Sequence, residues 1–424
     1  MTDLIRDMEW RGVLQDASEG AREAVTASSL TAYAGFDPTA NSLHVGSLMP
    51  ILALARLQRA GHSPIAVVGG GTGLIGDPSG KTAERTLQTP EQVEANVVGI
   101  RGQLERFLDF DATGNPARLV NNADWLTTMS AMAFLRDVGK YFTVNYMLAK
   151  ESVKRRIESE DGISYTEFSY LLLQAYDFLE LYDRFGCTVQ VGGSDQWGNI
   201  TAGIDLIRRL RSVKAHGLVL PLVTTSSGTK FGKTEAGTVW LAADRTSPFR
   251  FYQFWLNTED KDSTRYLKYF TFLEHPRIVE LIHAAESAPE KREAQRVLAR
   301  EVTKLVHGQA ALERAERTSE VLFGEDIATL PVADLLDVFG DAPSTELPKG
   351  ETDGDGVTLV DLLVRAGLAP SKGEARRLVQ SGGVYVNNRR QADVTARVTT
   401  ADAIGGQLFV LRRGQRQQHI IRLQ

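Results

Sequence analysis

The chain of 424 residues contains one cysteine, Cys187, and 7 histidines. A single cysteine excludes any disulfide within the chain, so a reducing compartment fits and we expect a cytoplasmic protein. Cys187 stands in the strand-like run CTVQV, where a packed core thiol is the expected role. The histidines lack the spacing of metal ligands, so we expect no bound metal.

Long hydrophobic runs are also missing. The most apolar stretch, LMPILALARLQRAGHSPIAVVGGG, is interrupted by arginines, prolines and glycines, so we expect no membrane span. The opening MTDLIRDMEWRG lacks the apolar segment of a signal peptide. The apolar content of 42% is ordinary for a globular protein, and the length suggests two or three domains.

The net charge of −5 is unevenly distributed. Residues 357–424 carry 11 basic and 4 acidic side chains, a net charge of +7, whereas the other 356 residues carry 37 and 49, a net charge of −12. A basic segment on an acidic body indicates a polyanion partner for that segment. A solvated charged face is the alternative explanation.

Alternating strand and helix patterns predict a parallel sheet in the first part of the chain. The runs at 31–36 and 64–68 have the pattern of strands, and the run LMPILALARLQRA (48–60) between them has helical spacing. A further strand is predicted at 187–193, followed by a helix. We therefore expect one α/β domain over residues 1–245.

The remainder divides into three parts. Residues 246–340 begin with the helix-start signal Thr-Ser-Pro and show helical spacing, which predicts an all-helical domain. Residues 341–356 are rich in turn formers and almost free of apolar residues, which predicts a flexible linker. Residues 357–424 predict a small basic domain.

Two lysines stand in the glycine-rich stretch SSGTKFGKTEAGT (226–238). Its Gly-Lys-Thr resembles the end of a phosphate-binding P-loop, but the first glycine of that motif would have to stand at Ser227. The following EAGTVWLA also gives no helix start, so we reject a P-loop. Lys230 and Lys233 instead suit a mobile loop that brings cations to a triphosphate. A solvated loop is the alternative if the pattern is taken alone.

The glycines of GTGLIG (71–76) spell a dinucleotide-binding pattern, but Asp-Pro follows where that motif requires a helix. A turn close to a ligand is the better interpretation. A stronger anion site is the loop 37–47, which leads from a predicted strand into a helix N-terminus at the ligand-binding edge of the sheet. Its candidate contacts are Thr39, His44 and the backbone at Gly46 and Ser47.

The helix predicted over 164–186 carries a polar stripe. Tyr170, Gln174 and Asp177 fall at i, i+4 and i+7 and share one face, while apolar side chains occupy the rest. Polar groups on a buried helix require partners. Either a structural hydrogen-bond network or a polar small ligand meets that requirement.

These motifs together resemble the bacterial tyrosyl-tRNA synthetases of class I. HVGS (44–47) is similar to the HIGH signature and KFGKT (230–234) to the KMSKS signature, and YAGFDPT, GLIGDPSGK, YLLLQAYDFL and VGGSDQWGNI match as blocks. The resemblance covers essentially the whole chain. It implies a Rossmann-like α/β catalytic domain with an inserted dimerisation segment, then an all-helical domain and a small α+β RNA-binding domain.

The resemblance implies a two-step tyrosine–tRNA ligase. ATP and L-tyrosine form tyrosyl-adenylate and pyrophosphate, and the tyrosyl group then passes to the 3′ end of tRNA(Tyr). The attacking carboxylate is already ionised, so no general base is needed and catalysis rests on positioning and electrostatics. ATP is expected as a substrate together with Mg²⁺, without a prosthetic group, and the protein is expected to be a homodimer.

The resemblance also implies the roles of individual residues. Those implied for the phosphates and catalysis are Thr39, His44, Lys81, Arg85, Lys230 and Lys233. Those implied for the other ATP contacts are Gly46, Gly192, Asp195 and Thr234. Those implied for tyrosine are Tyr33, Asp77, Tyr170, Gln174, Asp177 and Gln196. Phenylalanine would leave Tyr33 and Asp177 buried and unpaired, a rejection for which this family is the standard example.

Two positions depart from the family pattern. Ser47 replaces the last histidine of HIGH, so any ATP contact from that imidazole must come from elsewhere or be lost. Gly232 replaces the first serine of KMSKS, and Thr234 stands at its final serine. Both lysines are retained, and we retain the catalytic role of the loop with them.

The C-terminal segment resembles an RNA-binding module shared with a ribosomal small-subunit protein. The run 371–389 predicts a capped helix, a Gly-Gly turn and a strand. Lys372, Arg376 and Arg377 lie on or near one helical face and suit RNA phosphates, in contacts sensitive to salt. The amphipathic stretch 131–153 is a candidate dimer interface.

Two alternatives remain. One is the related tryptophanyl-tRNA synthetase, in which tryptophan rather than tyrosine would drive the exchange of pyrophosphate into ATP. A non-catalytic RNA-binding protein with a synthetase body is the other alternative, and intact His44, Asp177, Lys230 and Lys233 argue against it.

Overall fold

The computed structural model describes residues 3–79, 87–158, 162–226, 228, 231–234, 237–324, 327–340, 342–414 and 417–424. They form two compact units, Met1–Thr246 with Phe254–Val306, and Ser247–Gln253 with His307–Gln424. The predicted helical segment at 246–340 is therefore shared between the units, and the predicted domain boundaries stay a prediction.

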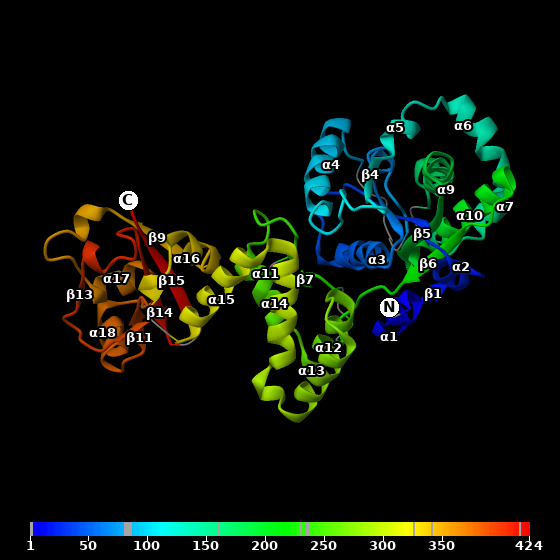
Figure 1. The fold of residues 1–424 in the computed structure, drawn as a ribbon. Helices are drawn as coiled ribbons and strands as arrows, with labels where there is room; N and C mark the ends of the chain where they lie inside the picture. Colours follow the sequence, from blue (N-terminus) through cyan, green and yellow to red (C-terminus); the bar gives the residue numbers. More distant parts are fainter. Residues whose placement is uncertain are drawn as a thin grey trace. The chain divides into compact units, whose positions relative to one another are not determined.

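A six-stranded sheet forms the centre of the first unit (Figure 1). In spatial order its strands are β1 (Asp16–Ala17), β6 (His216–Leu220), β5 (Cys187–Gly193), β2 (Thr31–Phe36), β3 (Ser63–Val68) and β4 (Arg118–Asn121). Every pair is parallel except β1 with β6. The predicted parallel α/β sheet is confirmed.

Helices cover both faces of this sheet, as a parallel sheet requires. Tyr33, Ile65 and Val67 pack in one hydrophobic core with α9 (Tyr165–Phe185) and α10 (Trp197–Arg211). The largely buried α3 (Leu48–Arg59) packs on β2, β3 and β5, and Figure 1 shows it on the side of the sheet opposite to α9.

Strands β2 and β5 separate before their carboxyl ends. Their pairing runs from Thr31–Cys187 to Tyr33–Gln190, whereas β2 stays paired with β3 as far as Phe36. The chain passes from β2 to β3 on one side, and β5 lies on the other side, so the order of strands reverses here. In an open α/β sheet such a crevice is the usual ligand site.

Further helices and short turns complete the first unit. Its other helices are α1 (Leu4–Arg11), α2 (Ala21–Ala27), α4 (Pro90–Leu104), α5 (Ala123–Leu126), α6 (Ala131–Asp137), α7 (Val144–Leu148), α8 (Glu151–Ile157), α12 (Asp260–Phe270), α13 (His275–Ser287) and α14 (Glu293–His307). Short 3-10 turns that matter below are η1 (Val45–Ser47), η2 (Thr72–Leu74) and η4 (Ser194–Gln196). A small hairpin consists of β7 (Lys233–Thr234) and β8 (Gly237–Thr238).

The second unit contains a five-stranded sheet and the helices that cover it. In spatial order the strands are β12 (Arg389–Gln391), β11 (Val384–Val386), β14 (Leu408–Arg413), β15 (Gln417–Leu423) and β9 (Ser344–Leu347). A separate pair consists of β10 (Val357–Thr358) and β13 (Arg397–Val398). The helices are α15 (Gln309–Gly324), α16 (Val332–Val338), α17 (Leu359–Arg365), α18 (Lys372–Gln380) and the first part of α11 (Pro248–Leu256), which is divided between the units.

The structure corrects the prediction of a flexible linker at 341–356. Ser344–Leu347 form β9, which pairs in parallel with β15, and Leu347 is buried at 2% exposure. The strand is short and lies at the edge of the sheet, so only one of its side chains is buried. A single buried apolar residue gives no alternating pattern. The turn-forming residues around it therefore led to the prediction of a linker.

Candidate active site

Side chains from separate strand ends form one hydrogen-bond network at the crevice. The hydroxyl of Thr72 donates to Asp37 (3.2 Å), and Asn122 Nδ2 donates both to the Thr72 hydroxyl (2.9 Å) and to Asp177 (2.8 Å). The hydroxyl of Tyr170 donates to Asp37 (3.2 Å). The ends of β2 and β4 are thereby joined to α9 through polar side chains.

The carboxylate of Asp177 lies within this network at 4% exposure. It accepts from Asn122 and from Trp125 Nε1 (2.7 Å). Asn122 cannot turn its oxygen toward Asp177 without loss, because that oxygen accepts from the backbone of Gly71 (2.8 Å). Burial raises the pKa of Asp177 to about 7, although both donors oppose the shift. Asp177 is thus an acceptor surrounded by donors.

Tyr33 presents its hydroxyl in the same buried region. The hydroxyl has no hydrogen-bond partner within the part of the chain that the structure describes, and its ring lies 5.2 Å from that of Phe178. Burial, and then the negative charge of Asp177, raises the pKa of Tyr33 well above its usual value. A buried hydroxyl without a partner costs free energy unless a ligand supplies one. Tyr33 and Asp177, the two residues predicted to hydrogen-bond the phenol hydroxyl of the substrate, therefore lie close together.

A second polar cluster lies beside η4. Gln196 Nε2 donates to Asp77 (2.7 Å), and Gln174 Nε2 donates to the oxygen of Gln196 (3.3 Å). Asn199 donates in turn to Gln174 (2.8 Å). The structure brings together the predicted Asp77, Gln174 and Gln196, and it shows Tyr170 bonded to Asp37.

The predicted HVGS signature forms the turn before α3. His44 caps η1, and its Nδ1 accepts from the backbone of Gly46 (3.0 Å). A methyl group at Gly46 would lie 2.7 Å from the imidazole, so this capped turn requires glycine there. Thr39 and His44 are exposed to solvent. Ser47, the departure from the family pattern, ends η1 directly before α3.

The KFGKT loop lies beside this turn. Gly232 has φ of 77°, and a methyl group there would lie 2.5 Å from Val45 Cγ2. Its carbonyl accepts from the backbone of Val239 (2.9 Å). The departure from serine at this position is explained by the left-handed conformation and the close approach to Val45.

The structure describes some of the predicted site residues only in part, and others not at all. Lys81, Arg85 and Lys230 fall outside the described residues. Lys233 and Thr234 are described by their backbone in β7, which pairs with β8 as an antiparallel strand. The described residues after Thr234 thus begin with a strand, in agreement with the rejection of a P-loop.

The other predicted contacts lie at the end of β5 and on α18. Gly192 is the next-to-last residue of β5, and a methyl group there would lie 3.0 Å from Gln196 Cβ. Asp195 accepts from Gln196 (3.3 Å). On α18, Lys372 forms an ion pair with Asp361 (2.5 Å), and Arg376 and Arg377 are exposed. Lys372 is therefore already partly neutralised, and the two arginines present the charge to solvent.

Five residues of the two clusters were not predicted from the sequence, namely Asp37, Thr72, Asn122, Trp125 and Asn199. Asp37 directly follows a predicted strand, and a polar residue at the carboxyl end of a parallel strand is a signal of a ligand site. Asn122 and Trp125 follow β4, a strand that was not predicted.

The fold and the site define a class I aminoacyl-tRNA synthetase. The family described as tRNA synthetases class I (W and Y) matches residues 26–324, and the chain belongs to it. A second family, described as the tyrosine–tRNA ligase SYY-like C-terminal domain, matches residues 334–421.

The particular relatives are tyrosine–tRNA ligases. That of Roseiflexus castenholzii is 58% identical over 100% of both chains, and that of Geobacillus kaustophilus is 55% identical over 99% of each. A C-terminally truncated mitochondrial tyrosyl-tRNA synthetase of Aspergillus nidulans matches with a TM-score of 0.68 and 33% identity, over 76% of this chain and 95% of that one. The chain belongs among the tyrosine–tRNA ligases and is an aminoacyl-tRNA ligase.

None of the helices in the described part of the chain is long and apolar enough to cross a membrane.

Proposed function

We propose that the chain activates L-tyrosine with ATP and transfers the tyrosyl group to the 3′ end of tRNA(Tyr). The observation that carries the proposal is the acceptor Asp177 beside the unpaired hydroxyl of Tyr33. A substrate phenol donates to the carboxylate and accepts from the tyrosine, so both groups are satisfied. Indole lacks a hydroxyl that would do both.

The same crevice supports the remaining substrate contacts. Asp77, with Gln174 beside it, suits the substrate ammonium, and Gln196 suits the carboxylate. The HVGS turn and the KFGKT loop lie side by side and suit the phosphates of ATP. A carboxylate oxygen of tyrosine bonds to the α-phosphorus while the bond to pyrophosphate breaks.

Magnesium is proposed to enter with ATP. The described residues contain no group of three or more His, Cys, Asp or Glu side chains placed to hold a metal. Phosphate oxygens of ATP and water molecules would supply ligands of the ion, as is usual for Mg²⁺ in nucleotide sites. The ion would neutralise the charge that develops on pyrophosphate.

A homodimer in the cytoplasm completes the proposal. The segment 131–153 exposes large apolar side chains, among them Met132 at 75% and Val144 at 60% exposure. Exposed apolar side chains gathered on one segment support a protein interface there. On α18, exposed Arg376 and Arg377 support contact with the tRNA phosphates.

Amino-acid-dependent exchange of pyrophosphate into ATP tests the function. We expect exchange with tyrosine and none above background with tryptophan or phenylalanine. Exchange driven by tryptophan would identify the sibling enzyme instead. Exchange with none of the three would leave the RNA-binding alternative.

Lys233→Ala is expected to slow tyrosyl-adenylate formation by about 100-fold, because one preorganised cation is lost where charge develops. Tyrosine affinity should change by less than about twofold, since the tyrosine contacts lie on other elements. Single-turnover kinetics and equilibrium dialysis measure the two quantities. Lys214→Ala, an exposed lysine elsewhere in the same unit, is the control. An unchanged single-turnover rate would remove Lys233 from the mechanism.

Gly232→Ala is expected to slow adenylate formation about tenfold. The new methyl group meets Val45 at 2.5 Å in a left-handed conformation that disfavours alanine, so the loop must move away from the HVGS turn. Gly228→Ala is a matched control, because Gly228 is also left-handed but a methyl group there meets nothing within 4 Å. Equal rates in the two variants would show that contact with Val45 is immaterial.

A further inference from the structure

The segment that leads into the KFGKT loop is bound by the first turns of α12. Asp262 accepts from the backbone N–H of Ser226 (2.9 Å), and it shares the single hydroxyl proton of Ser226 (3.1 Å) with Glu259 (2.7 Å). Arg265 Nη2 bridges the other oxygen of Asp262 (2.6 Å) and the carbonyl of Thr224 (2.5 Å). The hydroxyl of Tyr266 donates to the same carbonyl (3.1 Å). One helix therefore holds the backbone of Thr224–Ser226.

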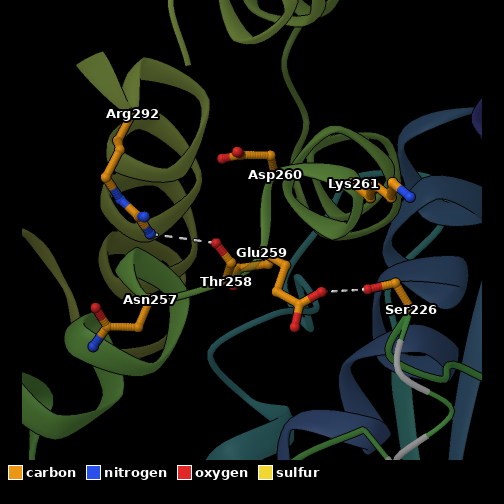
Figure 2. A pocket seen from close by; sticks show the side chains of 7 residues that line it. All are labelled: Ser226, Asn257, Thr258, Glu259, Asp260, Lys261 and Arg292. Atoms are coloured by element: carbon orange, nitrogen blue, oxygen red, sulfur yellow. Dashed lines mark hydrogen bonds between the residues drawn. The ribbon is translucent and has the colours of Figure 1, made fainter. Parts of the chain in front are cut away.

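Asp262 is only 3% exposed, and a carboxylate at that depth requires donors. Its donors are Ser226, which stands at the entry of the loop, and Arg265, which also donates to the carbonyl of Thr224 at that entry. Figure 2 shows the Ser226 hydroxyl directed at Glu259, one turn before Asp262, to which it donates at 2.7 Å. Asp260, in the same turn, instead accepts from Gln295 of α14 (2.5 Å).

The same helix also holds the loop beyond its lysine-bearing start. The ring of Phe231 is buried and stacks on Phe270 of α12 at 5.3 Å, with an angle of 8° between the planes. It meets Tyr266 edge-on at 5.0 Å. The loop is thus fixed to α12 on both sides of residues 227–230.

The far end of α12 is fixed to the helix that begins at the HVGS turn. Arg56 of α3 is 4% exposed, and its Nη2 donates to the carbonyls of Tyr269 (3.0 Å) and Thr271 (2.9 Å). Charged donors at the carbonyl end of a helix hold it firmly. Helix α12 therefore links the two signature motifs.

We propose that Asp262 is a positioning residue for adenylate formation, which acts by anchoring the entry of the KFGKT loop to α12. The proposal rests on the proposed function. Asp262 makes no contact with the two polar clusters of the crevice in the contacts described above, so it acts on the phosphates through the loop. Loss of the anchor misplaces the loop cations, and such misplacement slows the chemical step more than it weakens tyrosine binding.

Asp262→Asn tests the proposal in the full-length enzyme. The amide keeps one acceptor but turns a donor toward Ser226 or Arg265. We expect kcat for tyrosine-dependent exchange to fall about tenfold, with KM for tyrosine unchanged within about twofold. Asp260→Asn removes the same charge from the same helix end without touching the loop and should keep the wild-type kcat. Equal kcat values in the two variants would overturn the proposal.

Ser226→Ala provides a second test that leaves the Asp262 carboxylate itself in place. It removes the hydroxyl donor but keeps the backbone bond, so kcat should fall about threefold. In the double variant the effects should be less than additive, because both changes weaken the hold of α12 on Ser226. Fully additive effects would overturn the proposal. A wild-type enzyme without tyrosine-dependent exchange would instead refute the proposed function.

Discussion

Asp177→Asn is expected to lower kcat/KM for tyrosine on the order of 1,000-fold. Both protein partners of Asp177, Asn122 Nδ2 and Trp125 Nε1, are donors, and the proposed substrate hydroxyl is a third. An asparagine has one acceptor oxygen and must turn its own donor toward one of them. Losing a charge-assisted hydrogen bond and leaving a buried donor unpaired each costs about 1.5–3 kcal/mol, which together give that factor.

The pH dependence gives an independent check on the same carboxylate. Because burial raises the pKa of Asp177 to about 7, the acceptor form is lost as the pH falls through neutrality. The protonated form carries a donor among donors, so we expect kcat/KM for tyrosine to decrease between about pH 8 and about pH 6. The residual activity of Asp177→Asn should lack this step.

Asp183→Asn is the matched control for Asp177→Asn. It lies on the same helix, α9, but its carboxylate is partly exposed and pairs with Arg211 (2.7 Å). We expect it to keep wild-type kinetics, and we expect only Asp177→Asn to narrow the preference for tyrosine over phenylalanine. If Asp177→Asn kept the wild-type preference for tyrosine over phenylalanine, Asp177 would not recognise the phenol hydroxyl.

The central strands of the sheet could be predicted because they are buried on both faces. The strands at 31–36 and 187–193 appear in the structure with the predicted bounds, since these short runs rich in apolar and β-branched residues lie next to clear turn and helix signals. Strand β4 was missed because Arg118–Asn121 is an edge strand without a fully buried residue. Strand β1 has two residues and no pattern.

The site residues could be predicted where they lie on one secondary-structure element. Tyr170, Gln174 and Asp177 follow from the helical period alone, because the period fixes which side chains share a face. Asn122 could not be predicted, since its role depends on where β4 places it relative to Gly71 and Asp177. The contact between Gly232 and Val45 likewise joins segments far apart in the chain.

Removal of residues 325–424 is expected to leave tyrosine-dependent exchange within about twofold of wild type and to lower tRNA charging on the order of 1,000-fold. The proposed contacts for tyrosine and ATP all lie before Gly237, whereas the segment with a net charge of +7 is removed. Phosphate contacts supply much of the affinity for nucleic acids, so their loss acts on the second step only. Exchange and aminoacylation assays on one preparation measure both steps.

The site of the cut follows from the second hydrophobic core of the C-terminal unit. Leu335 and Phe339 pack there with Ile404, Val410 and Ile420 of the sheet region. A cut within the sequence-predicted linker would leave those side chains exposed, so a loss of both activities would then report aggregation. A cut at 325 removes every buried residue of this core and leaves only the partly buried Val321.

A charge variant of the full chain separates the loss of RNA contacts from the loss of a domain. Arg376→Gln with Arg377→Gln changes two exposed side chains of α18 and no buried one. We expect charging to weaken about tenfold at moderate salt, with a shallower salt dependence than wild type, while exchange stays unchanged. If the truncation instead reduced exchange and charging equally, the two steps would not be divided between the units, and the basic segment would serve the catalytic body rather than the tRNA.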